Sequence, residues 1–120
     1  MKAILNLDRH KTVSINDIYG ATDWRVRKSI ADEIHSLVKF EAIGQEIPRF
    51  NKPVEINFIS GKSNHVLDCD NVFCKVYIDG LVHAGVIKDD NYKLVKQVSS
   101  RSVKASVDFL EIEIVESKLK

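Results

Sequence analysis

Hydrophobic and polar positions follow two spacings along the chain, and each predicts one kind of secondary structure. Near the end, Leu110, Ile112 and Ile114 alternate with Glu111 and Glu113, which is typical of a strand with one buried face. Elsewhere hydrophobic residues recur at helical spacing, as in the stretch that begins near Trp24. The sequence predicts strands at 2–7, 54–60, 93–99 and 103–115, helices at about 23–40 and 71–84, and a polar loop at 8–20.

These elements give the order β-α-β-α-β-β, and we expect a mixed sheet with helices packed against it, an α/β fold. The last two strands are expected to form an antiparallel pair. Thr22 is the predicted N-cap of the first helix, and Gly44 lies a few residues beyond its end. Asp70 is the predicted N-cap of the second helix, and Gly85 the predicted C-terminal stop.

The composition describes one compact domain spanning residues 1–120. Hydrophobic residues make up 44% and charged residues 29% of the chain, which excludes a disordered protein. The longest hydrophobic runs are only a few residues, too short to cross a membrane, and the N-terminus lacks the hydrophobic region of a secretory signal. We therefore expect a cytoplasmic protein in which the two cysteines, Cys69 and Cys74, are reduced.

The near-neutral total charge conceals an uneven distribution. Lysine and arginine number 18 against 17 acidic residues, for a net charge of +1. Residues 68–90 contain five aspartates and two lysines, a net charge of −3, which leaves +4 on the rest of the chain. An acidic centre in a mildly basic protein is suited to binding metal ions in a cleft that a polyanion approaches.

The acidic centre contains spaced carboxylates. Asp68 and Asp70 are two residues apart, so in an extended segment their side chains point the same way. The pair Asp89-Asp90 follows the second predicted helix and meets them only if the fold brings the two segments together. Hard cations such as Mg²⁺ prefer oxygen ligands of this kind. The alternative is a helix cap followed by an acidic turn, with no metal.

A polar stripe extends from this centre along the predicted helix. Asn71, Lys75 and Asp79 are spaced four residues apart and share one helical face. Lys75 is either a modest surface ion-pair partner of Asp79 or, if the stripe faces the carboxylates, a group that positions a phosphate. An EF-hand calcium loop is excluded, because Phe73 occupies the position where its sharp turn needs glycine.

The pattern of these residues resembles a known family. Asp68-Cys69-Asp70-Asn71, then Lys75, Asp79-Gly80-Leu81 and Asp89-Asp90, resembles the D-x-D-N…K…D-G/A-L…D-D signature of the RusA family of Holliday junction resolvases. Upstream, the segment from Ser14 through Asn16 to Tyr19 resembles the Ser-x-Asn…Tyr segment of that family. The resemblance covers most of the chain.

The resemblance implies a homodimeric, Mg²⁺-dependent endonuclease that makes paired nicks in four-way DNA junctions during recombination and repair, with Mn²⁺ able to substitute. It implies that Asp68, Asp70 and Asp90 bind the metal, and that Lys75 is the supporting basic residue. Further supporting positions are Asn71, Asp79 and Asp89. Contacts to DNA are expected from Asn16, Arg25, Arg27, Lys28 and Lys62.

One departure keeps other functions open. Three residues separate Asn71 from Lys75, where the best-known members have two, and one extra residue rotates a helical side chain by about 100°. The alternatives are a branched-DNA-binding protein of the same fold that has lost catalysis, and a structural or regulatory protein whose aspartates only cap and turn the chain.

Overall fold

The computed structural model describes residues 1–20 and 23–119 and confirms a mixed α/β fold. The predicted order of strands and long helices is correct, and two short helices are added to it. In chain order the elements are β1 (Lys2–Asp8), α1 (Ile15–Tyr19), α2 (Trp24–Gly44), β2 (Val54–Lys62), the 3₁₀ helix η1 (Cys69–Asn71), α3 (Cys74–His83), β3 (Val95–Lys104) and β4 (Phe109–Glu116).

The four strands form one mixed sheet in the order β1-β4-β2-β3. β4 pairs antiparallel with both β1 and β2, whereas β2 and β3 are parallel. The predicted antiparallel pairing of the last two strands is therefore wrong, because β2 lies between them. The side-chain pattern explains this order: β2 is buried at every second residue and suits the centre, whereas β3 has no buried residue and suits an edge.

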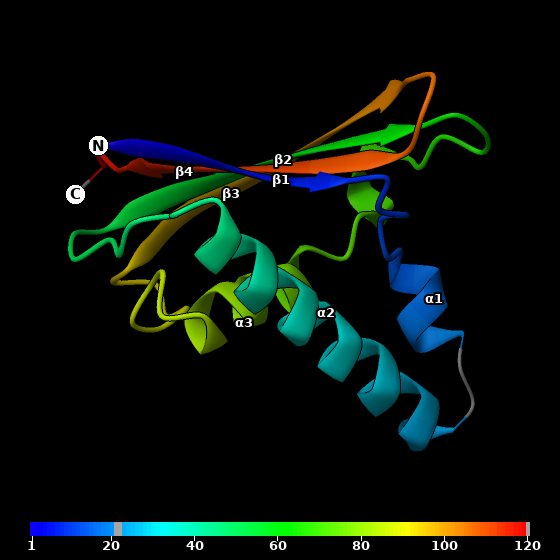
Figure 1. Ribbon diagram of the computed structural model, residues 1–120, viewed down its shortest axis with the longest axis horizontal. Helices are drawn as coiled ribbons and strands as arrows, with labels where there is room; N and C mark the ends of the chain where they lie inside the picture. The colour runs from blue at the N-terminus through cyan, green and yellow to red at the C-terminus, as the bar shows by residue number, and fades with distance from the viewer. Residues whose placement is uncertain (21–22, 120) are drawn as a thin grey trace.

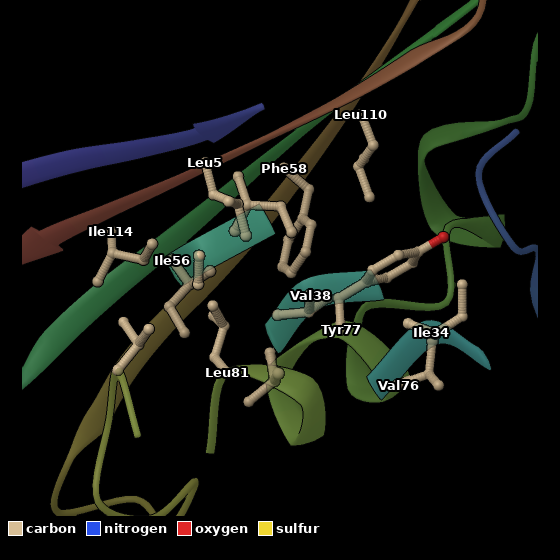
Figure 2. Packing of buried hydrophobic residues seen from close by; sticks show 14 of the residues in the cluster. Leu5, Ile34, Val38, Ile56, Phe58, Val76, Tyr77, Leu81, Leu110 and Ile114 are labelled. Atoms are coloured by element: carbon tan, nitrogen blue, oxygen red, sulfur yellow. The ribbon is translucent and has the colours of Figure 1, made fainter. Parts of the chain in front are cut away.

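All three α-helices lie on one side of the sheet (Figure 1). The residues that face them form rows across the strands, and in one row Leu5 lies opposite Ile112, which lies opposite Phe58. All three are at most 1% exposed. Figure 2 shows Leu5 and Phe58 of this row above Val38 of α2 and Tyr77 of α3, so the core lies between the sheet and two helices.

The helix α2 begins and ends later than the hydrophobic pattern predicts. Its N-cap is Asp23, whose side chain accepts a 2.9 Å hydrogen bond from the Arg25 amide, while Thr22 lies outside the described residues. Its C-terminal end extends to Gly44, because Ala42 continues the buried face for one more turn. None of the helices in the described part of the chain is long and hydrophobic enough to cross a membrane.

The predicted loop at 8–20 contains the short helix α1. A capping box holds its first turn: the Asp17 amide donates to Ser14 Oγ at 3.0 Å, and the Ser14 amide donates to Asp17 Oδ2 at 2.9 Å. Five residues are too few for the hydrophobic periodicity on which the sequence prediction depended. The spacing of Ser14 and Asp17 was the available signal.

The helix α3 begins three residues later than predicted. Residues 69–71 form η1, α3 starts at Cys74, and its N-cap Phe73 makes no side-chain capping bond, so Asp70 is not the cap. The predicted stop is confirmed. Gly85 has φ of 77°, and the Val86 amide donates to the Leu81 carbonyl at 3.0 Å, the pattern that ends many helices at a glycine.

Candidate active site

Lys75 joins α3 to the acidic turn that follows it. Its Nζ lies 3.4 Å from Asp79 Oδ1, one helical turn along, and 3.4 Å from Asp90 Oδ2, beyond the end of the helix. The ammonium group therefore bridges two carboxylates that are eleven residues apart in the chain. Because α3 begins at Cys74 rather than at residue 71, the extra residue before Lys75 lies outside the helix, in the segment between η1 and α3.

The bridge shifts the pKa of Lys75 and the pKa of Asp90 in opposite directions. The Asp79 carboxylate, helped by hydrogen bonds from Lys75 to Asp79 and Asp90, raises the pKa of Lys75 despite slight burial. Partial burial acts to raise the pKa of Asp90, but hydrogen bonding and charge attraction from Lys75 outweigh it, so the pKa of Asp90 is lowered. At neutral pH Lys75 is charged and Asp90 is ionised, the state in which a carboxylate binds a cation.

Asp89 holds the turn that carries Asp90. One of its carboxylate oxygens accepts a 2.7 Å bond from the Asp90 amide, and the other accepts a 3.2 Å bond from the Asn91 side chain. Asn91 in turn accepts a bond from the Lys93 amide. Asp89 thus positions the backbone beneath Asp90, while Asp90 itself points to Lys75.

The motif residues 68–71 are η1 and its N-cap Asp68, and two hydrogen bonds hold them. Ser100 Oγ on β3 donates to the Cys69 carbonyl, and the Asn71 amide donates to the Asp68 carbonyl at 2.9 Å. Both Asp68 and Asp70 are exposed. The expectation that they project from one extended segment is wrong, since Asp70 lies within the 3₁₀ turn.

The two segments that resemble the family are in contact. Ser14 and Val72 form an isolated antiparallel bridge, and the Phe73 amide donates to the Val13 carbonyl at 3.0 Å. The hydroxyl of Tyr77 accepts a 2.9 Å bond from the Val13 amide and lies 2.7 Å from His10 Nε2. The spacing of Tyr77 in the sequence indicates only a hydrophobic helical position, because nothing in that spacing distinguishes a ring that also anchors a loop.

The donor set suits a hard cation, but the ligands are not assembled in advance. The possible metal ligands are solvent-accessible oxygen atoms: the carboxylates of Asp68, Asp70 and Asp90 and the side-chain carbonyl of Asn71. Oxygen ligands of this kind are the ones that Mg²⁺ prefers. Within residues 1–20 and 23–119, no three histidine, cysteine or acidic side chains are grouped so as to hold a metal ion. Mg²⁺ sites often use one or two carboxylates, with waters and substrate phosphates completing the shell. The convergence of all three aspartates stays a prediction.

Basic residues of α2 lie beside the Lys75 bridge. Arg27 and Lys28 line a cavity of about 380 Å³ together with Lys75 and Asp79. Lys28 also pairs with Asp32 at 2.8 Å. Arg25 lies over the Trp24 ring and 3.6 Å from Asp23.

Two other expected DNA contacts differ in accessibility. Asn16 is exposed on α1. Lys62, by contrast, is only 5% exposed at the end of β2, so it is not an accessible phosphate contact. The hydrophobic pattern ended this strand two residues early and placed Lys62 in a solvated loop.

The two cysteines are free, as expected. Burial raises the pKa of the Cys74 thiol to about 11, so this thiol is protonated and unreactive at neutral pH.

Comparison of the chain with models of known protein families and with curated proteins finds no match.

Proposed function

We propose that this protein is a cytoplasmic, Mg²⁺-dependent endonuclease that resolves four-way DNA junctions by paired nicks, in DNA recombination and repair. The single observation that carries the proposal is the bridge from Lys75 to Asp79 and Asp90. It joins three separate positions of the RusA-like pattern at one place on the surface. A surface ion pair between neighbours on a helix would need no third partner from beyond the helix.

The residues divide the work of phosphodiester hydrolysis. Asp68, Asp70 and Asp90 would hold the cation, while Lys75 lowers the pKa of Asp90 and orients its carboxylate. A bound Mg²⁺ supplies a water of lowered pKa and neutralises charge that develops on the phosphate. Arg27 and Lys28 lie close enough to Lys75 to share one cavity, so they would hold the DNA backbone beside the carboxylates.

The proposed function has two consequences for how the protein would bind a junction. Four-way junctions are two-fold symmetric, and a homodimer with one site per subunit would nick opposite strands in the same way. Because phosphate contacts carry most of the affinity, binding should weaken steeply as salt concentration rises.

The test is cleavage of a synthetic four-way junction in Mg²⁺ by wild-type protein, by Asp70→Asn and by Glu33→Gln. Glu33 is an exposed carboxylate of α2, so Glu33→Gln is a matched control for the loss of one negative charge. We expect symmetric nicks from wild type and Glu33→Gln and none from Asp70→Asn. Nicking by Asp70→Asn at the wild-type rate would reject the proposal.

A second candidate function is branched-DNA binding without catalysis. It is favoured by the extra residue before Lys75 and by the lack of a grouped metal-binding set in the described chain. The same experiment decides between the two functions. A gel-shift showing tight junction binding, with no nicking in Mg²⁺ or Mn²⁺, would support the binding protein.

A further inference from the structure

The cavity beside the Lys75 bridge has two kinds of wall. It lies between α1, α2 and the start of α3, and its volume of about 380 Å³ is in the range of sites for small organic ligands. The aromatic rings of Tyr19 and Phe73 line one part. Cationic groups of Arg27, Lys28 and Lys75 line another.

The aromatic wall is accessible. The Tyr19 and Phe73 ring centroids are 5.9 Å apart and the ring planes are tilted by 58°, so the rings do not stack face to face. Tyr19 remains 73% exposed, whereas Phe73 is partly buried at the junction of η1 and α3. An exposed ring braced against a second ring provides a platform on which a flat, unsaturated ligand can stack.

The cationic wall selects the chemistry of such a ligand. Three basic side chains line the cavity, and two of them already pair with solvent-accessible carboxylates: Lys28 with Asp32, and Lys75 with Asp79 and Asp90. A ligand phosphate would take the place of these carboxylates as a partner of the cations. An aromatic platform combined with basic groups is the arrangement that binds nucleotides of unpaired strands, since bases stack on the rings and phosphates meet the cations. Lys75 belongs to both this cavity and the candidate active site, so a nucleotide bound here would adjoin the phosphate to be cut.

We propose that this cavity binds one unpaired nucleotide of branched DNA, with its base on Tyr19 and its phosphate near Arg27 and Lys28. The proposal rests on the proposed nuclease function and adds a preference, among branched substrates, for those with an unpaired base at the branch point. A linear duplex keeps its bases paired and stacked, so it cannot fill the cavity. Branch points with an unpaired base should therefore be preferred.

The test measures DNA binding without metal, by fluorescence anisotropy in EDTA. The probes are a labelled four-way junction with one unpaired thymidine at the branch point and a linear duplex of the same arm sequence. The variants are Tyr19→Ala, Tyr19→Phe and Phe40→Ala. Phe40 is 74% exposed on α2 but does not line the cavity, so Phe40→Ala is a matched control for an exposed ring.

We expect Tyr19→Ala to weaken binding of the junction about tenfold, the effect of losing one base stack. Tyr19→Phe should stay within about twofold of wild type, because it keeps the stacking face. Phe40→Ala should match wild type, and all proteins should bind the duplex equally. With 5-iodouracil in place of the unpaired thymine, irradiation should crosslink the DNA to Tyr19 or Phe73.

Wild-type affinity of Tyr19→Ala for the junction would overturn the inference, and so would an equal loss on junction and duplex. The result is separable from the proposed function because the assay contains no metal. A tenfold loss with Tyr19→Ala, together with no Mg²⁺-dependent nicking by wild type, would keep the nucleotide site and reject the nuclease. Nicking without a Tyr19 effect would reject only the nucleotide site.

Discussion

The two faces of α3 differ in burial: one packs in the core and the other is exposed to solvent. One face packs Tyr77 and Leu81, both 0% exposed, against the sheet and α2. The other presents Lys75 and Asp79 to solvent and to the acidic turn. An exposed ion pair contributes at most about 1 kcal/mol to stability, whereas a fully buried leucine contributes about 2–3 kcal/mol. The buried face therefore fixes the position of the helix, and the polar face is left available for binding and chemistry.

The sequence Asp79-Gly80-Leu81 shows this division in three consecutive residues. Asp79 pairs with Lys75, and Leu81 fills the core. Gly80 lets α2 approach, because a Cβ at this position would lie only 3.0–3.3 Å from the Val38 side chain. A Cβ at position 80 would require the Val38 side chain to move by a few tenths of an ångström.

The largest effect on the buried face is expected from Leu81→Ala. It removes a fully buried side chain and leaves a cavity between α3 and the sheet, so we expect a loss of about 2–5 kcal/mol in the free energy of unfolding. Urea denaturation measures it. Asp79→Asn, on the opposite face, should change the same quantity by less than about 1 kcal/mol. Equal effects of the two variants would remove the distinction between the faces.

Beside the polar face, Asp90→Asn should slow junction cleavage strongly and leave the fold intact. In the proposed function a bound metal would supply several kcal/mol of electrostatic stabilisation, so loss of one proposed ligand should slow junction cleavage about a hundredfold or more. The urea midpoint should stay within error of wild type, because Asp90 is exposed. Glu33→Gln is again the matched control. A variant that nicks normally would show that Asp90 only pairs with Lys75.

A smaller loss is expected from Tyr77→Phe, which keeps the ring and removes the hydroxyl. The Val13 amide would lose its partner, and an unpaired buried donor costs about 1–3 kcal/mol. Hydrogen exchange should be faster at the Val13 amide in particular, while amides in β4 change only by the global loss. Unchanged exchange at Val13 would mean that this hydroxyl does not anchor the Ser14 segment.

The smallest effect is a pH dependence of stability from His10. Burial lowers the pKa of His10 in the folded protein, so the unfolded chain binds more protons. Its contribution to stability is complete above about pH 6.5 and is lost as the pH falls through the lowered folded value. The urea midpoint should therefore fall between pH 7.5 and pH 5.5, and His10→Gln should reduce that fall. His35, whose pKa burial also lowers, accounts for part of what remains.

Much of the fold could be predicted because its signals are local. Alternation in 110–114 and helical spacing after Trp24 reflect which side chains are buried, and burial is repeated often enough to be read. Strand neighbours could not be predicted in this way. The partner of β3 depends on which strands have a hydrogen-bonded neighbour on each edge, and that is a property of the whole sheet.

In the candidate site, too, contacts within one helix could be predicted from the sequence, and contacts between distant segments could not. The i, i+4 spacing of Lys75 and Asp79 predicted their contact, since a helix fixes it. The second contact of Lys75, with Asp90, depends on how the Gly85 turn returns the chain and was only a possibility. The burial of Lys62 was missed because the strand continues past its last hydrophobic residue.

The most direct test is to map where a divalent cation binds to the protein. Mn²⁺ broadens the amide resonances of nearby residues, so substoichiometric Mn²⁺ should broaden residues 68–71 and Asp90 selectively in the NMR spectrum. Asp68→Ala should abolish this broadening, and excess Mg²⁺ should reverse it in wild type. Broadening that is absent from these residues, or that persists unchanged in Asp68→Ala, would contradict a metal site on the polar side of α3.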